Sequence, residues 1–93
     1  MQVEKILKID NVDMLLLLGV NDSNIRPIEN RLNTSLTFRG ENVYIKGEAA
    51  DVDLSERILK EMVFVLNTTG KLRLSDVETI LDLTEEGKAP AVQ

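Results

Sequence analysis

The first nineteen residues combine an alternating segment with an unbranched apolar run. In residues 4–9, apolar and charged side chains approximate the two-residue period of a strand. Residues 14–18 read Met-Leu-Leu-Leu-Leu, and side chains unbranched at Cβ favour a helix. Asn11 or Asp13 can start this helix, and Gly19 follows where a C-cap often has glycine. We predict a strand and then a short helix whose leucines lie in the core rather than in a partner groove.

A turn of sequence Gly19-Val20-Asn21-Asp22 leads into a second helix. Three apolar residues recur there at helical spacings; they are Ile25, Ile28 and Leu32. Pro27 falls in the first turn, where its missing N–H costs little. The candidate N-caps are Asp22, Ser23 and Asn24. We predict that this helix ends at residues 33–34.

Residues 35–39 and 43–46 alternate between polar and apolar, with a short turn at residues 40–42. This pattern predicts a hairpin with one covered face and one open face. The covered face should hold Leu36, Phe38, Val43 and Ile45. The open face should hold Thr37, Arg39, Tyr44 and Lys46. Gly47 is expected to end the second strand.

Two helices are predicted in the remainder of the chain. The first covers about residues 50–66, and residues 67–70 end it. Its apolar stripe consists of Leu54, Ile58, Leu59, Met62, Val63 and Leu66. The second begins at a capping box formed by Ser75 and Glu78 and runs to about Glu86, where Gly87 stops it. Its inward residues should be Val77, Ile80, Leu81 and Thr84.

The predicted order is strand, helix, glycine turn, helix, strand, strand, helix, helix. Three strands with helices on one face form a two-layer α+β domain with an antiparallel sheet. We place this single domain at residues 1–87. Residues 88–93 should be a tail or the start of a linker to a further domain.

The residue inventory excludes several kinds of chemistry. The chain has no cysteine and no histidine, which excludes disulfides, thiol catalysis, histidine bases and the usual zinc sites. No catalytic triad, positioned acid–base pair or activated nucleophile is present. The acidic residues of the last helix lack loop spacing for a divalent metal and should form a solvated face. We therefore expect a non-catalytic chain without a metal or cofactor of its own.

Charge and hydropathy bear on partners and location. The net charge is −5, with six basic and six acidic groups in residues 1–47, but five basic and ten acidic groups in residues 48–93. Nucleic-acid binding would therefore require a local basic patch. No apolar run approaches the roughly 20 residues of a membrane helix, and no secretory signal is visible. We expect no membrane partner.

The order of elements resembles that of a type I KH domain. The residues Gly19-Val20-Asn21-Asp22 stand where that family has its Gly-x-x-Gly loop, with Asp22 in place of the second glycine. More closely, the chain resembles the N-terminal segment of PhoH-like proteins. The resemblance covers roughly residues 4–87. It is carried by Leu18-Gly19, Asn21-Asp22, Asn24-Ile25, Ile28-Glu29, Arg39-Gly40-Glu41-Asn42 and Lys46-Gly47.

This resemblance implies a cytoplasmic protein with a role in RNA metabolism. PhoH-like proteins carry a P-loop ATPase domain after such a segment, yet no G-x-x-x-x-G-K-[ST] motif occurs here. The resemblance therefore implies an accessory domain, with ATP and Mg²⁺ bound by an ATPase domain outside these residues. That ATPase domain of the same protein would be one partner, and RNA or single-stranded nucleic acid the other.

The candidate nucleic-acid site consists of Gly19, Val20, Asn21 and Asp22 as backbone contacts, with Arg26 and Arg39 as phosphate contacts. KH domains clamp nucleotide phosphates at this loop. Tyr44 is the open-face aromatic available to stack a base. Alternatively, the turn only stops one helix and caps the next, and the arginines with Arg31 and Lys46 are simply solvated. The rival function is then a module that forms a homo-oligomer or docks the ATPase domain without nucleic acid.

Overall fold

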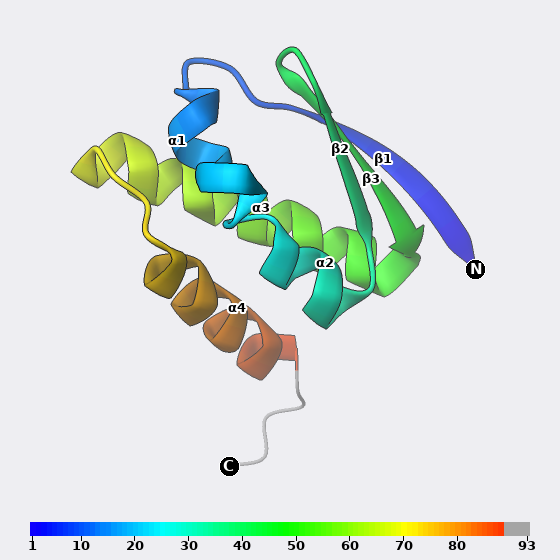
Figure 1. Cartoon of the computed structure of the whole chain (residues 1–93). Coiled ribbons are helices and arrows are strands. Elements are labelled where there is room, and N and C mark those ends of the chain that lie inside the picture. The colour runs from blue at the N-terminus through cyan, green and yellow to red at the C-terminus, as the bar shows by residue number, and fades with distance from the viewer. Residues whose placement is uncertain (89–93) are drawn as a thin grey trace.

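A computed structural model describes residues 1–88 and shows a three-stranded sheet with helices on one face (Figure 1). The elements are β1 (Gln2–Lys8), α1 (Met14–Leu18), η1 (a 3₁₀ turn, Val20–Asp22), α2 (Arg26–Leu32), β2 (Ser35–Arg39), β3 (Asn42–Glu48), α3 (Ala49–Thr69) and α4 (Leu74–Lys88). The predicted α+β class and element order are confirmed.

The sheet is antiparallel throughout, with strand order β1-β3-β2. Strand β3 is central, so its residues have a partner on each side: Tyr44 faces Ile6 of β1 and Thr37 of β2. The covered face is as predicted, with Leu36, Val43 and Ile45 buried and Phe38 half-buried. The alternation of polar and apolar residues therefore predicted correctly which side chains of the hairpin face the core.

The core lies between this face and the long helix α3, which packs against β1 and β3. The α3 stripe is buried as predicted, with Val63 half-buried at its margin. Helices α1 and α2 pack on α3, and α4 packs on α3 and α2. Val77, Ile80 and Leu81 of α4 are buried, and Thr84 is half-buried. The helices thus form a layer that covers one side of the sheet.

The predicted start of the last helix is wrong. Helix α4 begins at Leu74, and the Asp76 carboxylate accepts a hydrogen bond from the Arg73 N–H at 2.9 Å. Ser75 therefore lies inside the helix, and the Ser75–Glu78 capping box is not its start. Helix α3 extends three residues beyond Leu66 to Thr69, and it ends within the predicted residues 67–70, at a left-handed Gly70 with φ 81°.

The remaining boundaries differ by smaller amounts. Gly47 does not end β3, which continues to Glu48. Gly87 does not stop α4, whose backbone is helical to Lys88. Of the predicted tail at residues 88–93, Lys88 is part of helix α4, and residues 89–93 lie outside the described residues.

Candidate nucleic-acid interface

The glycine turn has a geometry that requires glycine at its first position. Gly19 has φ 78°, and a Cβ atom there would lie 2.7 Å from Ser23 Oγ and 3.0 Å from Asn24 Cγ. Asn21 and Asp22 also have positive φ values, at 54° and 59°. Asparagine and aspartate tolerate this region better than other side chains. The turn sequence therefore follows from backbone conformation before any ligand is considered.

The backbone donors of the turn are largely used within it. The Asp22 N–H donates to the Gly19 carbonyl at 3.2 Å and the Ser23 N–H to the Val20 carbonyl at 3.0 Å. The Asn24 N–H donates to the Leu18 carbonyl at 3.0 Å. A phosphate at this turn would have to compete with these bonds. The geometry thus favours a structural role for the turn backbone over a phosphate clamp.

Asn24 is a buried side chain that ties the turn to two other segments. It is only 2% exposed, and its Nδ2 donates to the Leu17 carbonyl at 3.2 Å and the Leu72 carbonyl at 3.4 Å. It also lies 3.5 Å from the Leu16 carbonyl. The prediction that Asp22, Ser23 or Asn24 caps α2 is wrong, because Ile25 occupies the N-cap without a side-chain bond. The prediction that Asp13 caps α1 is confirmed.

A groove of about 360 Å³ lies between the turn, α2 and the edge strand β2. Its lining is Leu18, Asp22, Ile25, Arg26, Glu29, Leu36, Thr37 and Phe38. The apolar residues offer a surface for a flat, weakly polar group such as a nucleobase. Arg26 is exposed and supplies a cation, whereas Asp22 places a carboxylate at the same rim. Of the six predicted site residues, Asp22 and Arg26 line this groove.

Glu29 fixes one wall of the groove. Its Oε2 accepts a hydrogen bond from the Leu36 N–H at 2.9 Å, which joins α2 to the edge strand. Its spacing of seven residues from Leu36 carries no recognised motif, so this role depends on the tertiary fold.

Arg39 lies elsewhere. Its guanidinium carbon is 6.0 Å from the centroid of the Tyr44 ring, on the open face of the sheet. The two residues line a separate hollow of about 280 Å³ with Glu4 and Thr37. The structure therefore does not bring Arg26 and Arg39 to one groove.

Arg31 has a structural partner rather than a place in the groove. Its Nη2 donates to Asp82 at 2.8 Å and also contacts Glu85, joining α2 to α4. Hydrogen bonding to Asp82 raises the pKa of the Arg31 guanidinium. Part of the predicted solvated acidic face of α4 is therefore paired.

The leucine run of α1 is only partly in the core. Leu17 is fully buried, but Leu15 is 82% exposed and Leu16 is also exposed. Val20, in the adjacent turn, is 80% exposed. The prediction that the whole run is core is therefore wrong, since a five-residue helix can bury only one side.

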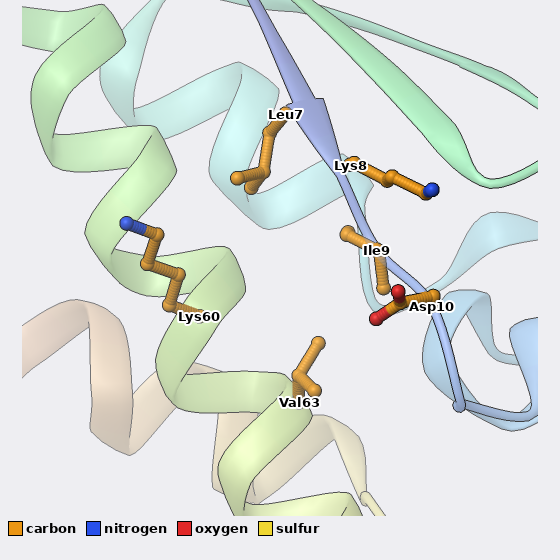
Figure 2. A pocket seen from close by; sticks show the side chains of 6 residues that line it. All are labelled: Leu7, Lys8, Ile9, Asp10, Lys60 and Val63. Atoms are coloured by element: carbon orange, nitrogen blue, oxygen red, sulfur yellow. The ribbon is translucent and has the colours of Figure 1, made fainter.

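A smaller hollow of about 160 Å³ lies where β1 ends beside α3. It is lined by Leu7, Lys8, Ile9, Asp10, Lys60 and Val63. Figure 2 shows Leu7 directed toward α3 and Lys8 directed the opposite way. Lys60 pairs with Glu56 at 3.5 Å.

Residues 1–88 lack a metal-binding cluster and a membrane-spanning helix. No group of three or more carboxylate side chains in this range is arranged to hold a metal ion. None of the helices in this range is long and apolar enough to cross a membrane.

Comparison with known proteins relates the chain to one family by local similarity. No protein-family model matches the chain. It is 44% identical over 50 residues to a PhoH-like protein of Mycobacterium leprae, and 42% identical over 50 residues to PhoH-like proteins of Mycobacterium bovis and Mycobacterium tuberculosis. Each match covers 54% of this chain but only 14% of the relative. Over about half of its length, the chain is thus homologous to PhoH-like proteins.

Proposed function

We propose that this chain is a non-catalytic, KH-like accessory domain of a PhoH-like protein, and that it binds RNA or other single-stranded nucleic acid. The observation that carries the proposal is the groove between the glycine turn, α2 and β2, which combines an apolar lining with Arg26. The element order of a type I KH domain and the homology to PhoH-like proteins support it. A cytoplasmic location and a neighbouring P-loop ATPase that binds ATP and Mg²⁺ belong to the same proposal.

The groove chemistry suits a base and one neighbouring phosphate. Single-stranded nucleic acids bind by laying bases on apolar or aromatic side chains while cations contact the backbone. Ile25, Leu36 and Phe38 provide the first kind of surface, and Arg26 the second. Asp22 opposes the phosphate, so the domain should bind weakly, and one phosphate contact should give a salt slope of only about −0.7.

The test is a fluorescence-anisotropy titration with a labelled oligouridine at low and physiological salt. Arg26→Ala should weaken binding and reduce the salt slope by about 0.7, the value for one single-strand phosphate contact. Asp22→Lys should strengthen binding at both salt concentrations. Arg57→Ala removes the same charge from an exposed position on α3 and serves as the matched control.

The outcomes separate the groove from general electrostatics. If Arg57→Ala weakens binding as much as Arg26→Ala, the groove is not the site. If Asp22→Lys leaves the affinity unchanged, no phosphate approaches the turn.

A protein-docking module is the second candidate, favoured by the exposed apolar side chains beside the groove. Leu15 and Val20 lie on α1 and the turn and are each at least 80% exposed. Such side chains suit a homo-oligomer or the neighbouring ATPase domain as partner. Sedimentation analysis of the chain and its Leu15→Ser variant tests this candidate. A homo-oligomeric module should self-associate, Leu15→Ser should reduce that self-association, and the chain should not bind RNA at low salt.

A further inference from the structure

No element of residues 1–88 covers the face of the sheet turned away from the helices, and this face has a defined arrangement of side chains (Figure 1). The register aligns three rows across it. The central row is Ile6, Tyr44 and Thr37. One flanking row is Lys8, Asn42 and Arg39, and the other is Glu4, Lys46 and Ser35. Tyr44 thus stands in the middle of this open face, between two rows that contain cations.

The open face is positively charged on a protein whose net charge is −5. Its central part carries three cations, Lys8, Arg39 and Lys46, and one carboxylate, Glu4. A second carboxylate, Glu48 at the far end, is paired with the Met1 amine at 2.7 Å. Lys8 of β1 and Arg39 of β2 lie on either side of Asn42 of β3, so their Cα atoms are separated by two strand spacings, roughly 10 Å. This local charge is complementary to a polyanion and opposite to the charge of the molecule.

The aromatic and cationic groups of this face are already adjacent. The Arg39 guanidinium lies over the Tyr44 ring at 6.0 Å, within the range of a cation–π contact. Both residues line the hollow of about 280 Å³ beside the ring. Ile6, the cross-strand neighbour of Tyr44, is 59% exposed and extends the apolar surface. A stacking surface and a phosphate contact are thus presented side by side.

We propose that this open face is a second binding surface for single-stranded nucleic acid, in which Tyr44 stacks a base and Lys8, Arg39 and Lys46 contact phosphates. The surface lies on the opposite side of the sheet from the groove. Thr37 of the edge strand β2 lines both the groove and the hollow beside Tyr44. A single nucleic-acid chain can therefore pass from the groove around this edge to the open face. The proposal shares its ligand class with the proposed function but does not depend on the groove.

The experiment uses the whole chain and the same labelled oligouridine. Lys8→Ala and Arg39→Ala change exposed side chains and should each reduce the salt slope by about 0.7. Tyr44→Thr replaces the ring by another side chain that strands favour, and it should weaken binding about five- to 150-fold, the effect of losing one base stack. Lys71→Ala and Arg57→Ala, at exposed positions away from the sheet, are the matched controls.

A second measurement avoids substitution. Tyr44 is the only tyrosine and the chain has no tryptophan, so intrinsic tyrosine fluorescence reports directly on the open face. Quenching that saturates with the anisotropy change is the expected result. It should persist in Arg26→Ala, which alters the groove alone.

The contrary results are distinct from one another. Binding that depends on Arg26 but not on Lys8, Arg39 or Tyr44 overturns this proposal and leaves the groove standing. Binding that depends on the open face but not on Arg26 supports this proposal and overturns the groove. Absence of RNA binding at low salt overturns both, and self-association that requires Tyr44 would then assign the face to protein contact.

Discussion

At the scale of single residues, Asn24 holds the turn in place. Its amide group is buried and bonds carbonyls of α1 and of the loop between α3 and α4. Asn24→Ala leaves these carbonyls without their donor, and unsatisfied buried groups cost about 1–3 kcal/mol each. We expect the free energy of unfolding to fall by at least this amount in urea denaturation. Asn30→Ala, at an exposed position of α2, should change it by less than about 0.5 kcal/mol.

The comparison of these two variants also tests the reading of the turn. If Asn24→Ala is no more destabilising than Asn30→Ala, the turn is not held by this side chain. Its geometry would then need another explanation.

Residue roles were predictable where they depend on near neighbours. Asp13 was predictable as a cap because its partners, the Leu15 and Leu16 amides, are two and three residues away. Asn24 was not, because its carbonyl partner at Leu72 is 48 residues away. Strand alternation placed Arg39 on the open face, but grouping it with Arg26 required knowing which side of the sheet the turn lies on.

At the scale of elements, ion pairs link β1 to α3 and α2 to α4. Lys5 of β1 lies 2.9 Å from Glu56 and 3.4 Å from Asp53, both on α3. The hydrogen bond from Lys5 lowers the pKa of the Glu56 carboxyl, and the bond to Glu56 raises the pKa of Lys5. Arg31 links α2 to α4 in the same way.

The shifted pKa values predict how stability depends on pH. The contribution of Glu56 is fully present above its ordinary pKa of 4.5 and is lost as the pH falls through the lower folded value. The contribution of Lys5 is fully present below 10.5 and is lost as the pH rises through its higher folded value. Glu56→Gln should therefore be less stable than the parent at pH 7, and this difference should shrink below pH 4.5.

Urea denaturation at a series of pH values measures that difference. Glu61→Gln, at an exposed position on the same helix, should run parallel to the parent chain. A difference for Glu56→Gln that is constant down to pH 3 would show that the ion pair does not contribute.

Element existence was predictable from the sequence, and element ends were less so. The apolar stripes of α3 and α4 fit a helix whether α4 starts at residue 74 or 76, so the stripe cannot decide the start. The start of the helix depends on which side-chain oxygen accepts a hydrogen bond from a free backbone amide. Here the Asp76 carboxylate accepts one from the Arg73 N–H. The sequence alone does not distinguish a cap that uses Ser75 from one that uses Asp76, because the choice depends on the position of the preceding loop.

At the scale of the whole molecule, the excess negative charge lies mainly outside the segments that form the two candidate surfaces. Residues 1–47, which form the turn, α2 and nearly all of the sheet, are neutral in sum, and the excess acid lies in residues 48–93. The molecule measures 36 × 29 × 21 Å, whereas the Debye length is about 8 Å at physiological ionic strength. The acidic side chains that lie farther than this length from the two candidate surfaces should therefore be screened from a bound nucleic acid in physiological salt.

This screening gives a prediction that distinguishes local contact from overall charge. Glu78 is exposed on α4, and Glu78→Lys changes the net charge by two. If binding is local, the affinity for oligouridine should be unchanged in physiological salt. It should rise at about 10 mM salt, where the Debye length is about 30 Å. Asp22→Lys makes the same charge change inside the groove and should raise the affinity at both salt concentrations. Equal gains from the two variants in physiological salt would show that the protein attracts nucleic acid through net charge alone, without a defined site.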